Sequence, residues 1–275
     1  MKTDLNIIKR TGSSVPLDVQ KIHKVVNFAC EGLNGVSSSL VQMNAGIQFA
    51  DGITSREIQD LLVRSANDLI TLENPNYQYV AARLLLYGIY KDVYGGFDKT
   101  SLLEMVKKNI ERRVYDSAIL ESYSEEEFEK MEKYLKHNRD ENFTYAGLRQ
   151  IVDKYLCQDR SSGEIYESPQ HMYMMIAATL FANYPKEDRL HYVRRYYDAT
   201  SLFKINIPTP VMAGVRTPIR QFASCVLVDS DDTLDSIFAS DMSIGRYTAQ
   251  RAGIGINAGR IRGINSKIRG GEVAH

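Results

Sequence analysis

The chain has 275 residues, with 34 Lys and Arg balancing 34 Asp and Glu and five His, so its formal net charge is zero. A hydrophobic share of 44% and a charged share of 25% are typical of a globular protein with a sizeable core, and they exclude disordered, collagen-like and coiled-coil classes. The balanced charge argues against a protein that coats nucleic acid or an anionic membrane, so we expect neither partner. The most apolar stretch, residues 172–182, is shorter than the roughly 20 residues needed to cross a bilayer. The N-terminus has no signal-peptide core, and we expect a cytoplasmic protein.

The first hundred residues predict a strand hairpin followed by four helices. Residues 5–10 and a return through Val15 and Leu17 are typical of two short strands joined by a Thr-Gly-Ser-Ser turn. Helices are expected from Asp18 to about residue 35, over 39–50, from the capping box at Thr54 onward, and over 77–94. We place the first domain at residues 1–96.

The remaining chain changes character at residue 204. Residues 97–203 have helical patterning, with a capping box at Ser124 and a Ser168-Pro169 helix start. From 204 to 275 we expect an extended segment over 205–210, a buried strand over 223–228, a helix over 232–250 and a glycine-rich end. One or two strands cannot satisfy their own edges, so this third domain is expected to be the beginning of a larger α/β structure.

The cysteines and histidines do not form a ligand pattern. Cys30, Cys157 and Cys225 are widely spaced and odd in number, and no zinc-type spacing occurs, so no metal site is predicted. Cys30 and Cys157 are expected to be packing residues, and the histidines to occupy solvated or helix-surface positions. For Cys225 two interpretations stay open: an inert strand cysteine, or a thiol near a ligand held by the polar segments of residues 209–220.

Two basic segments are candidates for binding phosphate. Lys9 and Arg10 beside a glycine turn, with Lys21 at the next helix start, suit a triphosphate, although from spacing alone a solvated basic edge of the hairpin is the simpler explanation. Residues 253–259 lack the dinucleotide fingerprint, since an arginine-rich stretch follows instead of an apolar helix. Either a phosphate site or a flexible surface loop accounts for the five cations of this region: Arg251, Arg260, Arg262, Lys267 and Arg269.

Three groups of motifs together resemble the large subunit of class I ribonucleotide reductases. The segments Pro208-Thr209-Pro210, Gly214-Val215-Arg216-Thr217-Pro218 and Arg220-Gln221-Phe222-Ala223-Ser224-Cys225 resemble the entrance to its barrel. The stretch from Gln250 to Arg262 resembles another signature stretch of that subunit. Lys9-Arg10, Gly12, Lys21-Ile22 and the stretch from Tyr77 to Leu84 are similar to its ATP-cone. The resemblance implies an ATP-cone of a β-hairpin and helix bundle, a helical domain, and the incomplete first part of a ten-stranded α/β barrel.

The family reduces the 2′ position of ribonucleoside diphosphates by thiyl-radical chemistry, and the resemblance implies site residues for it. Cys225 corresponds to one member of the reducing thiol pair, and Thr209 and Ser224 to residues that bind the substrate diphosphate. The specificity-effector site, for a deoxynucleoside triphosphate, corresponds to Asp232, Thr233, Leu234, Arg262 and Arg269. The activity site, for ATP or dATP, corresponds to Lys9, Val15, Pro16, Leu17, Asp18, Val19, Gln20, Lys21, Ser55 and Lys91. The cone departs from the family pattern at Thr11, Ser55, Gln59 and Gly88.

The resemblance also implies partners. The radical cysteine and the second reducing thiol of the family lie beyond residue 275, so we expect an N-terminal portion of the subunit that needs a separate C-terminal chain. A metal-containing small subunit is expected to supply the radical, thioredoxin or glutaredoxin to reduce the enzyme, and a second copy to form a dimer. The alternative is a nucleotide-sensing regulatory module without a catalytic role.

Overall fold

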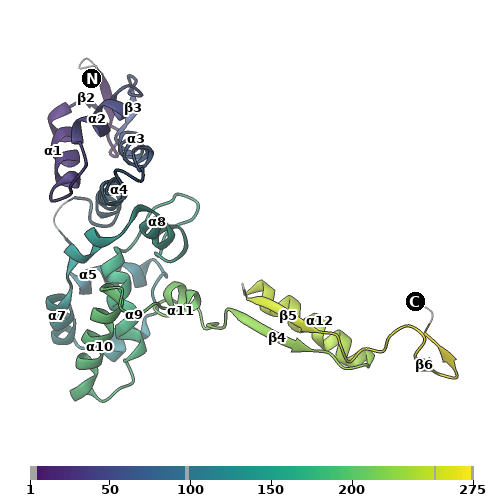
Figure 1. Ribbon diagram of the computed structural model, residues 1–275. Coiled ribbons are helices and arrows are strands. Elements are labelled where there is room, and N and C mark those ends of the chain that lie inside the picture. The colour runs from purple at the N-terminus through teal and green to yellow at the C-terminus, as the bar shows by residue number, and fades with distance from the viewer. Residues whose placement is uncertain (1–4, 97–98, 251, 274–275) are drawn as a thin grey trace. The chain divides into compact units, whose positions relative to one another are not determined.

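The computed structural model describes residues 5–96, 99–250 and 252–273 (Figure 1). The chain divides into two compact units, Met1–Ile207 with Arg216–Pro218, and Pro208–Val215 with Ile219–His275. Within the described ranges no helix is both long and apolar enough to cross a membrane.

A three-stranded sheet opens the first unit, with strand order β2-β1-β3. Strands β1 (Asn6–Ile8) and β2 (Ser14–Pro16) form the predicted antiparallel hairpin, and Gly12 takes the positive φ of +82° that its turn requires. Strand β3 (Ile53–Thr54) pairs in parallel with β1 and was not predicted. It has only two residues, and Thr54 serves both as a strand residue and as the cap of the next helix.

Four helices pack against this sheet: α1 (Val19–Cys30), α2 (Ser38–Gly46), α3 (Ser55–Asp68) and α4 (Tyr77–Tyr94). The predicted signals hold, because Asp18 caps α1, Thr54 and Glu57 form a capping box, and Gly95 ends α4 with φ +72°. Helix α2 ends four residues before the predicted Ala50. Tight i to i+3 turns after Gly46 bury Phe49 there and leave Ile47 exposed.

The rest of the first unit is helical, as predicted. It comprises α5 (Leu102–Glu111), α6 (Ala118–Ser122), α7 (Glu125–Tyr134), the 3₁₀ helix η1 (His137–Asn142), α8 (Tyr145–Lys154), α9 (Pro169–Leu180) and α10 (Lys186–Ser201). Helix α9 is buried along all but its end, since every residue from Pro169 to Ala178 is inaccessible. Leu180, on its last turn, is exposed.

The first unit contains a buried ion pair between Arg216 and Glu167. Arg216 Nε donates to Glu167 Oε2 at 2.8 Å, and Arg216 Nη2 donates to the Tyr155 carbonyl oxygen, also at 2.8 Å. Both charged side chains are fully buried, and Tyr115 donates a further hydrogen bond to Glu167. The expectation that the segment around Arg216 presents polar groups to a ligand is therefore wrong for the Arg216 side chain.

The second unit contains a short helix, a parallel strand pair and a small hairpin. Its elements are α11 (Thr209–Gly214), β4 (Cys225–Asp229), α12 (Leu234–Ala249), β5 (Gly253–Asn257), β6 (Lys267–Ile268) and β7 (Gly271–Glu272). Strands β4 and β5 are parallel, with α12 as the crossover between them. Residues 205–210 were predicted to be extended, but Thr209 and Pro210 begin α11, because a proline in the first turn favours a helix start.

The two-stranded β4–β5 sheet of the second unit carries exposed apolar side chains on both of its strands. Leu227 of β4 is 88% exposed, and Ile256 of β5 is exposed as well. Helix α12 carries an exposed apolar stripe of Leu234, Phe238 and Met242 at four-residue spacing. The predicted fold class, an α/β protein with an unclosed barrel start, is confirmed.

Candidate functional site

Three of the predicted activity-site residues lie at one end of the N-terminal sheet. Lys9 follows β1 and Ser55 follows β3, and the parallel register of Ile8 with Thr54 places both residues at the same end of these strands. Asp92 of α4 joins this end to Lys91, since it forms ion pairs with both Arg10 and Arg56. The hairpin turn, the start of α3 and the end of α4 are therefore held together.

Lys91 is the most enclosed cation of this group. Its Nζ lies 4.2 Å from the ring centroid of Tyr87. Partial burial lowers the pKa of Lys91, and the nearby guanidinium of Arg10 adds to this. An anion placed beside Lys91 would reverse both effects, which is the behaviour expected of a phosphate ligand.

The other predicted activity-site residues begin at the opposite end of β1. In the antiparallel register Pro16 lies opposite Asn6, and the Leu17 amide donates to the Leu5 carbonyl oxygen at 2.8 Å. Asp18 accepts from the Gln20 and Lys21 amides as the cap of α1, and its carboxylate pairs with Lys21 Nζ at 3.3 Å. The set therefore follows the whole length of β1, which at about 3.3 Å per residue is about 10 Å.

A hollow of about 230 Å³ lies between α1 and α4 and shares Tyr87 with the Lys91 contact. Its walls are largely apolar: Lys24, Val25, Phe28, Ala29, Arg83 and Tyr87. None of these residues is among the predicted site residues. Their helical spacing on two different helices gives no signal of a shared pocket.

Two departures from the family pattern lie next to each other in the cone. Gln59 Nε2 donates to the carbonyl oxygen of Leu84 at 2.6 Å, and the Gln59 side chain is buried. A Cβ built on Gly88 would lie 3.5 Å from Gln59 Cγ. The Gln59 amide nitrogen thus bonds the α4 backbone.

Cys225 occupies the first position of β4 and is exposed. Gly253 lies directly opposite on β5, and its amide donates to the Ser224 carbonyl oxygen at 2.8 Å. A Cβ on Gly253 would come within 4.0 Å of the Cys225 sulfur. The interpretation of Cys225 as an inert, buried strand cysteine is therefore not supported, while Cys30 and Cys157 are partly buried.

The two residues predicted to bind the substrate diphosphate lie on different segments of the second unit. Ser224 is exposed and directly precedes β4. Thr209 is the first residue of α11. Both residues carry a hydroxyl and stand at or directly before the start of an element.

Four of the five predicted specificity-effector residues are brought together beyond the strand ends. The Asp232 carboxylate accepts from Arg262 twice, from the backbone amide at 3.1 Å and from Nε at 2.5 Å, and the Asp232 carbonyl oxygen accepts from Nη2 at 3.3 Å. Thr233 caps α12 by accepting from the Ser236 amide at 3.2 Å, and Leu234 is exposed beside it. Arg269, in contrast, lies in the β6–β7 turn with φ +46° and makes no hydrogen bond or ion pair with another described residue.

The glycine-rich segment is a strand followed by a loop. Residues 253–257 form β5, so the flexible-loop interpretation is wrong for them. Arg260 pairs with Asp231 at 3.1 Å and with Asp229 at 3.3 Å, so this cation has carboxylate partners on the β4 side. Two residues considered in the sequence analysis, Arg251 and His275, lie outside the described residues.

The prediction that the histidines occupy solvated or helix-surface positions is wrong for His137 and His171. His171 is fully buried at the start of α9, and its ring lies 5.3 Å from that of His137, perpendicular to it. Burial lowers the pKa of His137 to about 4 and that of His171 well below its ordinary value. Among the described residues, no group of three or more His, Cys, Asp or Glu is arranged to hold a metal ion.

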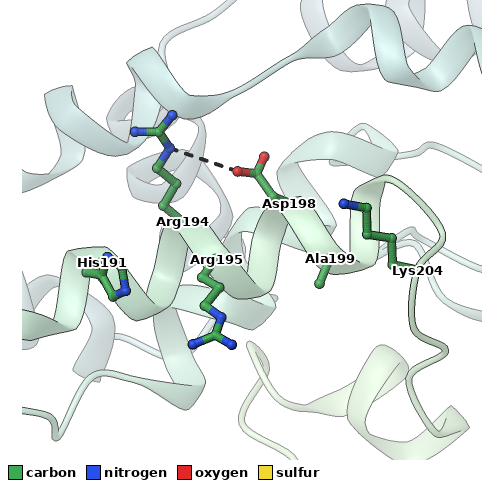
Figure 2. Close-up of a pocket in the computed structure, with 6 residues that line it drawn as sticks. All are labelled: His191, Arg194, Arg195, Asp198, Ala199 and Lys204. Atoms are coloured by element: carbon green, nitrogen blue, oxygen red, sulfur yellow. Dashed lines mark ion pairs between the residues drawn. The ribbon is translucent and has the colours of Figure 1, made fainter.

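A hollow of about 510 Å³ lies along α10 and contains none of the predicted site residues. Figure 2 shows the residues that line it. Arg194 and Arg195 point to opposite sides of the helix, and Arg194 Nε lies 3.9 Å from Asp198. Asp198 also pairs with Arg139 at 2.7 Å. The cations do not converge on one point, and we assign no ligand to this surface. Its lining residues are His191, Arg194, Arg195, Asp198, Ala199 and Lys204.

Comparison with known families divides the chain into three matches. Residues 5–92 match the ATP cone domain, residues 141–220 the ribonucleotide reductase all-alpha domain, and residues 223–275 the ribonucleotide reductase barrel domain.

Whole-chain comparison gives relatives with the same name. The chain is 50% identical over all 275 residues to ribonucleoside-diphosphate reductase 1 subunit alpha of Escherichia coli K12, and 43% identical over 271 residues to the subunit alpha of Enterobacteria phage T4. The Helicobacter pylori subunit alpha is 34% identical over 267 residues. The chain spans 36% of the length of the first two relatives and 33% of the third.

Proposed function

Because this chain belongs to the family of ribonucleotide reductase large subunits, as the N-terminal part of such a subunit, we propose that it contributes to the reduction of ribonucleoside diphosphates. It supplies one reducing thiol, part of the substrate site and two nucleotide sites. The division that we propose is an allosteric cone at residues 1–96, a helical domain at 97–203 and the barrel start at 204–275.

Cys225 is the proposed reducing thiol. Replacement of the 2′-hydroxyl by hydrogen consumes two electrons and two protons, which two thiols supply as they join in a disulfide, and the hydroxyl leaves as water. The exposed position of Cys225 at the entrance of β4, opposite a glycine, is the observation that carries this proposal. A glycine opposite the sulfur leaves its face open to a second thiol and to the ribose.

Thr209 and Ser224 are the proposed diphosphate ligands. Hydroxyl and amide donors hold phosphate oxygens without adding charge. Ser224 directly precedes Cys225, so a diphosphate bound to Ser224 would bring the attached ribose toward the sulfur.

The cone is proposed to bind ATP. Lys9, Lys21 and Lys91, with Ser55, would bind the triphosphate, and the hollow beside Tyr87 offers apolar walls to the base. Asp92 positions Arg10 and Arg56 at the same end of the sheet.

The loop beyond the strands is proposed to bind a deoxynucleoside triphosphate that sets substrate preference. Asp232 fixes Arg262 there, next to the cap of α12, while Arg269 provides a second cation. The exposed stripe of α12 that begins at Leu234 suits a second copy of the subunit, so effector and dimer contact would share one helix.

Three further partners follow from this proposal. The remaining part of the large subunit, joined to this chain or supplied as a separate one, would cover β4, β5 and their exposed apolar residues. A small subunit with a metal centre would supply the radical, and thioredoxin or glutaredoxin would reduce the disulfide. The site of action would be the cytoplasm.

The test is reconstituted turnover. The chain is combined with the remaining part of the subunit, the small subunit, a thiol reductant and a ribonucleoside diphosphate, and deoxynucleotide formation is measured. Replacing Cys225 with serine should abolish turnover under these conditions, whereas Cys30→Ser, at a partly buried cysteine of the cone, should retain it. Undiminished turnover of the Cys225→Ser protein would refute the proposal, and calorimetric titration with MgATP tests the cone separately.

A further inference from the structure

The last turns of α4 have two faces, one within the cone and one that contacts η1 and α9. Tyr87 and Lys91, four residues apart, lie together in the cone. Tyr90 and Tyr94, also four apart, contact η1 and α9 instead. Successive helical residues are about 100° apart, so Tyr90 and Lys91 share one backbone segment while facing different surroundings.

Tyr90 begins a continuous chain of side-chain hydrogen bonds through the helical region. Its hydroxyl donates to Asp140 Oδ2 at 2.7 Å, and Gln170 Nε2 donates to Asp140 Oδ1 at 2.7 Å. The Tyr197 hydroxyl donates to Gln170 Oε1 at 2.5 Å. Four elements, α4, η1, α9 and α10, are thereby connected by buried polar groups, which are costly to leave unpaired.

Asp140 is the central group of this chain. It is 1% exposed and forms no ion pair with any described residue. Burial raises its pKa to about 7, while the hydrogen bonds from Gln170 and Tyr90 act in the opposite direction. A shift of α4 that lengthens the Tyr90 bond would remove one of two donors from a buried carboxyl group, so η1 or α9 would have to respond.

A second contact from α4 lies beside this chain and is incompletely bonded. The Tyr94 hydroxyl lies 3.3 Å from His171 Nδ1. Neither His171 Nε2 nor His137 Nδ1 has a hydrogen-bond partner among the described residues. These free nitrogens offer alternative partners to a displaced tyrosine, so the cluster has more than one bonding arrangement available.

We propose that the chain Tyr90–Asp140–Gln170–Tyr197 transmits nucleotide occupancy of the cone to helices α9 and α10. The inference rests on the proposed ATP site, in which Lys91 binds the triphosphate. Binding at Lys91 moves the end of α4, and Tyr90 passes this displacement to Asp140. Both nucleotide binding and the packing of α9 then bias one shared element, which is the physical requirement for coupling.

The test is hydrogen exchange of the full chain, measured by mass spectrometry with and without saturating MgATP. In the wild type, MgATP should change exchange in α4 and also in η1 and the first turn of α9. Tyr90→Phe removes only the hydroxyl, so it should bind MgATP with a dissociation constant within about threefold of the wild type. MgATP should nevertheless no longer change the hydrogen exchange of η1 and α9 in this variant.

Two further variants keep the test decisive. Asp140→Asn serves if Tyr90→Phe proves unstable. It retains the shape of the side chain but cannot accept the bonds from both Tyr90 and Gln170 in the same way, so the MgATP-dependent exchange change in η1 and α9 should again be lost. Tyr79→Phe, on the same helix but outside the chain, should behave as the wild type. An exchange change in η1 and α9 that persists in Tyr90→Phe, or MgATP binding with no such change in the wild type, would overturn the inference alone. Failure of the wild type to bind MgATP would instead overturn the proposed ATP site together with this inference.

Discussion

The two units of this chain differ in how completely they bury their own surfaces. In the first unit helices α4 and α9 are enclosed by neighbours, and its charged core pair, Arg216 with Glu167, is fully satisfied. In the second unit Leu227 of β4 and Phe238 of α12 remain exposed, and the parallel pair has no third strand among the described residues. The difference indicates that the first unit buries its own apolar surface, whereas the second unit leaves apolar residues of β4 and α12 open, as the proposed function requires.

The largest effect on stability is expected from the buried ion pair. Arg216→Met leaves the Glu167 carboxylate buried without its cation, which should lower the free energy of unfolding by about 3–5 kcal/mol. Chemical denaturation of the first unit measures this. The matched control is Arg112→Met, which removes an exposed pair with Glu164 and should cost no more than about 1 kcal/mol. Equal losses in the two variants would contradict the account.

The second largest effect on stability is expected from a leucine substitution in the first unit, and the same substitution in the second unit compares the two directly. Leu84 of α4 is fully buried, so Leu84→Ala should cost about 2–5 kcal/mol through lost contacts and a cavity. Leu227→Ala, at the exposed position on β4, should change stability by less than about 0.5 kcal/mol in this chain alone. If Leu227→Ala proved as destabilising as Leu84→Ala, the barrel start would be closed in solution.

The buried histidines predict a pH dependence of the first unit. His137, whose pKa is lowered to about 4, and His171 are neutral when folded and bind protons on unfolding. The free energy of unfolding should therefore rise as the pH increases from about 4 to 6.5, by up to about 3 kcal/mol for His137. Asp140, with its pKa raised to about 7, acts in the opposite direction between about pH 4 and 7 and reduces the net rise.

Denaturation of His137→Gln across this pH range isolates one of these contributions. Between pH 4 and 6.5 the free energy of unfolding should increase less steeply with pH. The slope should fall by the contribution of about one bound proton, because one titrating group is gone. The Lys99 cation acts on both imidazoles and the Tyr94 ring lies against both, and neither residue changes in this variant. An unaltered slope would show that His137 is solvated in the folded protein.

The smallest effect concerns nucleotide affinity in the cone. Lys91→Ala should weaken MgATP binding about tenfold, equivalent to about 1.4 kcal/mol, since one partly buried cation is lost from the triphosphate. Lys107→Ala, at an exposed lysine of α5 paired with Glu125, is the control and should bind as the wild type. Equal affinities in calorimetry would remove Lys91 from the site.

Local signals predicted the elements of the fold well. Asp18, the Thr54–Glu57 capping box and Gly95 each act on neighbouring residues, so the sequence alone located the helix ends. Strand β3 was missed because two residues carry no periodicity. The burial of His171 had a signal, since the run that follows it on α9 is apolar on all sides and indicates a helix enclosed all round.

Contacts between distant residues could not be predicted in this way. The ion pairs from Asp92 to Arg10 and Arg56, and from Arg216 to Glu167, join residues separated by 82, 36 and 49 positions. The family resemblance selected Cys225 and the effector residues, but it gave no sign of the polar chain that begins at Tyr90. That chain exists only because four elements meet.

The central claim, that Cys225 is a working thiol, is tested most directly by a single turnover without external reductant. The reconstituted protein is given ribonucleoside diphosphate, quenched by acid, and its cysteine peptides are analysed by mass spectrometry. We predict that the Cys225 peptide appears in a disulfide with a second cysteine, in proportion to the deoxynucleotide formed. Deoxynucleotide formation with Cys225 still a free thiol would contradict the account.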